Sequence, residues 1–113
     1  MKTVDEIKAL VTAMPGVILD YPFGAETAVY KIGSTDGKMF ALIDENSRPV
    51  RLSLKCDPQL AELLRQRYES VLPGYHLNKK HWNTVVCSGQ LGDDELKDLI
   101  RHSFELVSSG PVD

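Results

Sequence analysis

The side chains with the most chemical potential lie together in one segment, Pro73–Thr84, which reads PGYHLNKKHWNT. This segment holds the adjacent lysines Lys79 and Lys80, two of the three histidines and the single tryptophan of the chain. Lysines supply positive charge, asparagines and histidines supply hydrogen-bonding groups, and aromatic rings can stack on bases. The combination is typical of a site for an anionic, phosphate-rich ligand, and it suits nucleic acid.

The aromatic and imidazole side chains of this segment also allow a purely structural interpretation. A tryptophan such as Trp82 often anchors a core, and Tyr75 can hold the segment on a sheet. The residue types alone leave open whether Tyr75, His76 and Trp82 are structural or functional.

Metal binding and catalysis receive little support from the residue spacing. His76 and His81 are five positions apart, which is not the H-E-x-x-H pattern of zinc enzymes. Cys56 and Cys87 form no C-x-x-C pair, and the adjacent lysines would repel a cation. Neither a nucleophile elbow nor a phosphate-binding loop is present. We therefore expect no metal, no cofactor and no enzymatic activity. An enzyme would need a pocket that joins one of these histidines to one of these cysteines.

The charge of the chain is unevenly distributed. The net charge is −3, which argues against a nonspecific nucleic-acid coat. Between Arg48 and His81, however, seven basic residues face three acidic ones, a local balance of +4, and the rest of the chain carries −7. A local basic surface on an acidic protein is therefore expected.

Apolar periodicity and turn residues define the expected elements. Helices are expected at Thr3–Met14, where Thr3 and Glu6 form a capping box, after the cap Asp57–Pro58, and from Asp93 onward. Strands are expected at Thr27–Ile32, Lys38–Ile43, Val50–Cys56 and Thr84–Ser88. The core-facing residues expected in the later two helices are Leu60, Leu63, Leu64, Tyr68, Leu96, Leu99, Ile100, Phe104 and Val107.

The strand at Val50–Cys56 alternates between apolar and polar residues. Arg51, Ser53 and Lys55 point to one face, and the apolar residues between them point to the other. This pattern predicts an α+β fold of two layers, with a mainly antiparallel sheet whose helices pack on one face. The length of 113 residues suits a single domain over residues 1–113.

The cysteine content and the hydropathy pattern indicate a cytoplasmic protein. Two cysteines are too few for a disulfide framework, and we expect both as buried, reduced thiols. The first residues, MKTVDEIKALV, place acids where a signal peptide has its apolar stretch, and no apolar run approaches the length of a membrane span. We therefore expect no association with a membrane.

Several motifs together resemble the MmcQ/YjbR family over almost the whole chain. They are YPFG at Tyr21–Gly24, LKCDP at Leu54–Pro58, PGYHLNKKHWNT at Pro73–Thr84 and SFELV at Ser103–Val107. The resemblance implies a compact fold similar to CyaY (frataxin-like) or to secretion chaperones. It also implies DNA binding through a double-wing arrangement of hairpins, and it brings no catalytic residues.

Two functions are therefore expected. The first is DNA binding, with the hairpin turns at Ser34–Gly37 and Glu45–Arg48 as wings. Its expected contact residues are Lys79, Lys80, Arg51, Lys55, His81 and Asn78. The alternative is a protein- or small-ligand-binding domain that uses the polar face of the sheet and has no nucleic-acid role. With either function, we expect a monomer or weak dimer.

Overall fold

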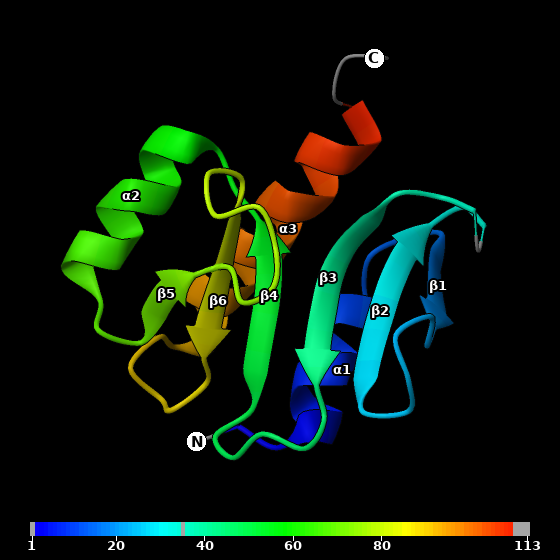
Figure 1. The fold of residues 1–113 in the computed structure, drawn as a ribbon, viewed down its shortest axis with the longest axis horizontal. Helices are drawn as coiled ribbons and strands as arrows, with labels where there is room; N and C mark the ends of the chain where they lie inside the picture. Colours follow the sequence, from blue (N-terminus) through cyan, green and yellow to red (C-terminus); the bar gives the residue numbers. More distant parts are fainter. Residues whose placement is uncertain (1, 35, 110–113) are drawn as a thin grey trace.

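The computed structural model describes residues 2–34 and 36–109, and within them the chain forms three helices and one six-stranded sheet (Figure 1). The helices are α1 (Val4–Thr12), α2 (Pro58–Arg67) and α3 (Asp93–Ser109). The strands are β1 (Val17–Asp20), β2 (Thr27–Ile32), β3 (Met39–Asp44), β4 (Arg51–Lys55), β5 (Val71–Pro73) and β6 (Trp82–Val86). All neighbouring strands are antiparallel, in the order β1-β2-β3-β4-β6-β5.

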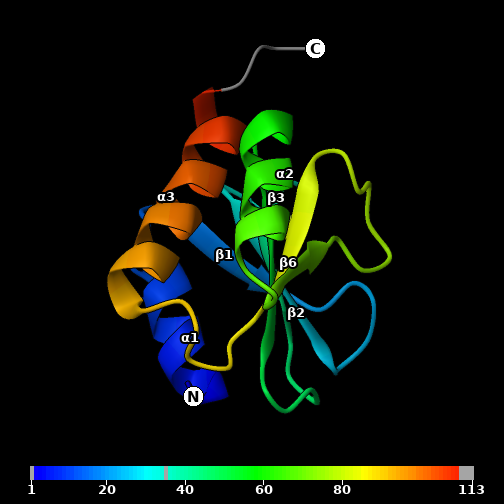
Figure 2. The same ribbon diagram turned by 90° about the vertical axis from the view of Figure 1, so that its left-hand side faces the viewer.

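The helices cover one face of the sheet, which confirms the predicted two-layer α+β fold (Figure 2). The main core lies between these layers and is built from the apolar residues of the alternating strands, such as Leu52 and Leu54 of β4. The predicted stripe of α3 is confirmed, because Leu96 and Ile100 are buried in this core. We call the other side of the sheet the open face.

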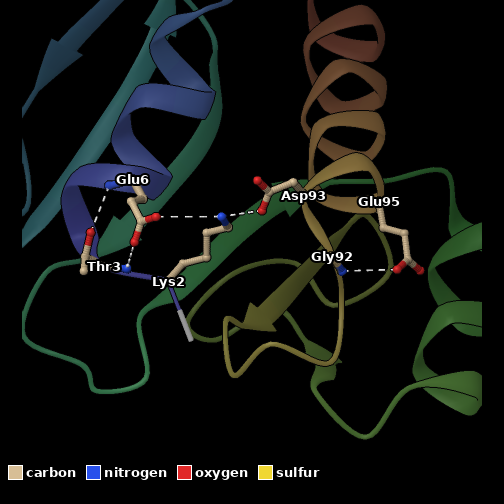
Figure 3. Close-up of polar contacts among 6 residues, drawn as sticks. All are labelled: Lys2, Thr3, Glu6, Gly92, Asp93 and Glu95. Carbon is tan, nitrogen blue, oxygen red and sulfur yellow. Dashed lines mark hydrogen bonds and ion pairs between the residues drawn. The ribbon is translucent and has the colours of Figure 1, made fainter.

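The N-terminal residues tie the first helix to the last one. Thr3 accepts a hydrogen bond from the Glu6 amide at 3.2 Å, and the Glu6 carboxylate accepts one from the Thr3 amide at 3.0 Å, so the predicted capping box is confirmed. The Lys2 ammonium lies 3.9 Å from the Glu6 carboxylate and forms a second ion pair with Asp93, the first residue of α3 (Figure 3). The starts of α1 and α3 are therefore linked by one lysine.

A serine joins α3 to the middle of the sheet. The Ser103 hydroxyl donates to the Phe40 carbonyl at 2.5 Å and accepts from the Lys55 amide at 2.9 Å. Ser103 is fully buried, and the Phe40 and Phe104 rings pack edge to face with centroids 5.4 Å apart. These contacts fix the helix layer across β3 and β4.

Two sequence expectations are wrong in the region around α2. Leu63 was expected to face the core but is 62% exposed, and the small Ala61 is buried in its place. The segment expected to be a loop from Pro73 contains the end of β5, and β6 begins at Trp82 rather than at Thr84. The connection between β5 and β6 is therefore residues 74–81, which we call the 74–81 loop.

Within the described residues, no helix combines the length and the apolar content needed to cross a bilayer.

Candidate ligand-binding pocket

The open face carries a pocket of about 260 Å³ between the β1–β2 connection and the 74–81 loop. Figure 2 shows both connections on the side of the sheet away from the helices. The pocket is lined by Phe23, Thr27, Leu42, Asp44, Arg51, Ser53, Tyr75, His76, Leu77 and Thr84. Apolar walls with a few polar groups are typical of small-molecule sites.

The floor of the pocket is one row of residues that crosses the sheet. Leu42, Ser53 and Thr84 are direct neighbours on β3, β4 and β6. The hydroxyl oxygens of Ser53 and Thr84 lie 2.8 Å apart, and the Thr84 oxygen also accepts from the Tyr75 amide at 3.0 Å. The pair has two hydroxyl hydrogens and uses one between them. Within the described residues no further acceptor takes the other hydrogen, so it remains as a donor for a ligand.

Opposite charges stand side by side at one end of the floor. Asp44 and Arg51 are direct cross-strand partners on β3 and β4, and both line the pocket. Among the described residues they form no ion pair with each other, and the Arg51 guanidinium has no acidic partner. One Asp44 carboxylate oxygen accepts from the Asn46 amide at 3.1 Å. An arginine with free donors in a largely apolar pocket is a receptor for anions.

The 74–81 loop is held by its own backbone and by α2. Gly74 donates to the Trp82 carbonyl at 2.9 Å, and a Cβ atom at Gly74 would lie 2.7 Å from the Trp82 Cβ. Arg65 of α2 donates to the carbonyl oxygens of Lys79 and Trp82 and to the Asn83 side chain. The loop is therefore a fixed wall of the pocket.

Two neighbouring residues of this loop present rings to the pocket. His76 has φ of +59°, a left-handed conformation that costs a non-glycine residue about 1–3 kcal/mol. Its ring centroid lies 3.9 Å from that of Tyr75, and Tyr75 remains 60% exposed. Backbone strain of this kind is enriched at functional sites.

The opposite wall is anchored by a network at Glu45. The Tyr21 hydroxyl donates to the Glu45 carboxylate at 2.6 Å, and the Lys8 ammonium lies 3.1 Å from the same carboxylate. The Tyr21 hydrogen bond and the Lys8 ammonium hold the pKa of Glu45 below its ordinary value. The Glu45 amide also donates to the Glu26 carbonyl at 2.9 Å. This network fixes the connection that carries Phe23, whose side chain is 65% exposed.

Trp82 lies in an apolar cluster on the open face, next to the pocket. It is 7% exposed and packs with Val29 and Leu42 on the open face, and Leu77 of the 74–81 loop covers this cluster. Leu42 and Leu77 also line the pocket, so Trp82 belongs to a cluster that shares residues with the pocket. Trp82 is buried and is positioned to report on ligand binding.

The residues predicted to contact DNA do not form one cluster. Arg51 lies in the pocket, and Lys55 lies on the same face four residues along β4, roughly 13 Å away at the usual strand rise. The Lys79 ammonium donates to the Gly74 carbonyl at 3.2 Å. The Asn78 side chain accepts from the Lys80 amide at 2.9 Å and shapes the loop.

The remaining predicted DNA-contact residues lie near one end of β6. His81 is half-buried, and its carbonyl accepts from the Cys56 amide at 2.8 Å, which places it beside Lys55 at the end of β4. Lys80 is exposed. The two expected wings lie at opposite ends of the sheet, because one joins β2 to β3 and the other joins β3 to β4 (Figure 1). Residue 35, inside the first wing, lies outside the described residues.

The cysteines lie away from the pocket. Cys56 and Cys87 are both free and buried, as the sequence predicts, and neither lines the pocket. Burial raises the pKa of each thiol to about 11. An enzyme would need a pocket that joins a histidine to a cysteine. The pocket that His76 lines contains neither cysteine. No group of three or more His, Cys, Asp or Glu side chains within residues 2–34 and 36–109 is placed to hold a metal ion.

Several pocket residues escaped the sequence reasoning. The alternation on β4 predicts that Arg51 and Ser53 share the polar face, but nothing local indicates that Asp44 lies beside Arg51. The sequence does indicate a loop position for Phe23, because an aromatic side chain between Pro22 and Gly24 cannot easily be buried in a strand or helix.

The fold places the chain in a class of small α+β domains, with an antiparallel sheet covered by helices on one face. Within that class the chain belongs to the YjbR family, whose family model matches residues 12–106. This assignment confirms the resemblance found in the sequence.

Two relatives are similar in sequence over most of the chain. YbdF, an uncharacterized protein of Escherichia coli O157:H7, is 44% identical over 103 residues, which cover 91% of this chain and 82% of YbdF. YyaQ, an uncharacterized protein of Bacillus subtilis strain 168, is 30% identical in an alignment that covers 95% of this chain and 99% of YyaQ.

Solved structures share the fold. The crystal structure of a Deinococcus radiodurans protein with a DUF419 domain matches with a TM-score of 0.91 at 42% identity, over 100% of this chain and 83% of that one. A crystal structure from Pseudomonas syringae matches with a TM-score of 0.77 at 29% identity, over 95% of this chain and 99% of that one. These similarities confirm the architecture and name no ligand.

Proposed function

We propose that the protein is a small-molecule-binding domain whose ligand, an organic anion, occupies the pocket on the open face. The observation that carries this proposal is the Arg51 guanidinium, which lines the pocket beside Asp44 and forms no ion pair among the described residues. Ligand pockets usually measure about 300–1,000 Å³. A pocket of about 260 Å³ therefore suits a compact molecule rather than a polymer.

The walls of the pocket support the same proposal. The 74–81 loop and the β1–β2 connection are each fixed by hydrogen bonds, so the pocket is formed before a ligand arrives. A preformed site avoids the entropy cost of ordering its walls on binding.

A fragment screen tests the proposal. Small carboxylic acids, alcohols and amines are titrated into ¹⁵N-labelled protein, and the tryptophan fluorescence is followed in parallel. We expect carboxylic acids to shift the amides of Leu42, Ser53 and Leu77 saturably and to change the emission of Trp82, because these residues line the pocket or lie next to it. Arg51→Gln should weaken this binding about tenfold or more.

The matched control is Arg101→Gln. Arg101 lies on α3, on the far side of the sheet, and its side chain is 59% exposed. This variant should bind the same acids as the unchanged protein. The proposal fails if no acid shifts the pocket amides saturably, or if Arg51→Gln and Arg101→Gln bind alike.

DNA binding is the second proposal. It is supported by the local positive balance and by Lys55 and Lys80, which have no acidic partner among the described residues. Affinity for a duplex should fall with rising salt, and Lys55→Ala and Lys80→Ala should each lower the salt slope by about 1. Lys79→Ala should change the affinity for DNA mainly by disturbing the 74–81 loop, because the Lys79 ammonium donates to the Gly74 carbonyl. Affinity that is unchanged in the first two variants would remove these lysines from the proposed interface.

A further inference from the structure

We infer that the ligand of this pocket is a small zwitterion with an aromatic or bulky apolar body, such as a free amino acid. Its anionic group binds Arg51 and its cationic group binds Asp44. This inference rests on the proposed function and narrows the class of ligand.

The first argument is the unpaired state of the two opposite charges. Residues directly across an antiparallel ladder have Cβ atoms about 4.5–5.5 Å apart, close enough for an arginine and an aspartate to pair. Asp44 and Arg51 have this relationship but do not form an ion pair in the structure. Each therefore keeps its charge available, and the two receptors lie side by side. An α-amino acid carries its ammonium and carboxylate groups on one carbon atom, so a single small molecule can present both charges to neighbouring residues.

The second argument is the balance of charge among the residues that line the pocket. Asp44 and Arg51 are the lining residues that carry full opposite charges, and His76 is the remaining titratable group with a basic side chain. The nearby acid Glu45 is paired with Lys8 at 3.1 Å, and Asp20 is paired with Lys31 at 3.1 Å. A site with one free charge of each sign favours a ligand with one charge of each sign.

The third argument is the character of the walls. Phe23 and Tyr75 are 65% and 60% exposed and stand on opposite sides of the pocket. An apolar ligand body placed between them would remove aromatic surface from water, which is favourable by about 25 cal/mol per Å². At the floor, the spare hydroxyl hydrogen of the Ser53–Thr84 pair is available to the ligand's carboxylate.

Three probes with one shared body test the inference on the unchanged protein. They are L-phenylalanine, 3-phenylpropionate and 2-phenylethylamine, which carry both charges, the negative charge alone and the positive charge alone. We expect L-phenylalanine to bind about tenfold or more tightly than either of the other probes. Amide shifts and Trp82 fluorescence measure the binding.

The outcomes separate this inference from the proposed function. If 3-phenylpropionate binds as tightly as L-phenylalanine, the inference is overturned while the proposed anion site stands. If none of the three probes shifts the pocket amides, the inference is overturned, and the fragment screen above decides whether the proposed function falls as well.

Two variants assign the charges. Asp44→Asn should abolish the preference for L-phenylalanine over 3-phenylpropionate, because the amide keeps an acceptor for the Asn46 amide but loses the negative charge. Arg51→Gln should weaken the binding of L-phenylalanine and 3-phenylpropionate and leave the binding of 2-phenylethylamine unchanged. Asp36→Asn, in the exposed β2–β3 turn, and Arg101→Gln are the matched controls and should retain the full preference. An unchanged preference in Asp44→Asn would overturn the assignment of Asp44.

Discussion

The Nε atom of Arg65 donates to the Oδ1 atom of Asn83 at 2.6 Å, and this contact joins α2 to β6. The same guanidinium donates to the backbone carbonyls of Lys79 and Trp82, at the end of the 74–81 loop. The side-chain Nδ2 atom of Asn83 in turn donates to the Ala61 carbonyl at 3.3 Å. The planar guanidinium of Arg65 thus holds the loop that forms one wall of the pocket. The position of Arg65 in the last turn of α2 would by itself suggest only an interaction with the helix dipole.

Arg65→Lys should destabilise the protein and loosen the 74–81 loop. A lysine ammonium cannot reach three acceptors with the geometry of a guanidinium, so we expect a loss of about 1–3 kcal/mol in the free energy of unfolding. Urea unfolding measures the loss, and hydrogen exchange should quicken at the loop amides. The matched control is Arg67→Lys, whose exposed guanidinium lies 5.6 Å from the Tyr68 ring centroid and should matter by less than about 1 kcal/mol. Equal losses in both variants would contradict the role of Arg65 in holding the 74–81 loop.

Gly74→Ala should damage the same loop by a different route. The added methyl would lie 2.7 Å from the Trp82 Cβ and 3.0 Å from the Trp82 carbonyl oxygen, so the backbone must shift. Crowding of this kind costs about 1–3 kcal/mol. Thermal unfolding measures it, with Gly92→Ala as the control, because a Cβ there meets only a Glu95 carboxylate oxygen at 3.8 Å. If the two variants have the same unfolding temperature, the close approach of Gly74 to Trp82 does not limit the residue type at position 74.

Glu45→Gln should lower stability at neutral pH but not in acid. The Tyr21 hydrogen bond and the Lys8 ammonium lower the pKa of Glu45 in the folded state relative to the ordinary value of 4.5. The folded state therefore binds fewer protons, and the stabilisation is present above the unfolded pKa and is lost as pH falls through the folded pKa. Urea unfolding at pH 7 and at pH 3 should show a difference between variant and parent that shrinks in acid. Glu62→Gln, on the exposed side of α2, serves as the control with little change at pH 7.

Cys56 and Cys87 should resist alkylation in the native protein. With a pKa of about 11, only about one thiol in a thousand is ionised at pH 8, and burial limits the access of reagents further. We expect iodoacetamide to label neither residue over a period that labels both in denaturant, as read by intact mass. Rapid native labelling of either cysteine would show that its site opens readily.

The parts of the fold that depend on neighbouring residues were predictable from the sequence. The capping box at Thr3 and Glu6 and the cap at Asp57 were found because each bond spans only two or three residues. Strand β2 was predicted at its observed bounds, and β3 and β4 were predicted to within one residue at each end. Local turn signals and side-chain alternation are sufficient for such elements.

The parts that depend on distant partners were not predictable. Strand β5 has three residues, one of them Pro73, and it is a strand because it pairs with β6. Leu63 points to solvent because α2 approaches the sheet through the small Ala61, and the helical period alone does not reveal that choice. The pocket likewise depends on the register that sets Asp44 beside Arg51, which follows from the β3–β4 pairing rather than from either strand alone.

The ion pair between Lys2 and Asp93 has a practical consequence for how the protein can be attached to a surface. It places the start of the described chain beside the first turn of α3, and the 17 residues of α3 carry the other end about 25 Å away (Figure 1). Both ends therefore belong to the helix layer. A biosensor chip coupled through the helix layer would leave the open face toward the flow, so immobilisation and ligand access do not compete.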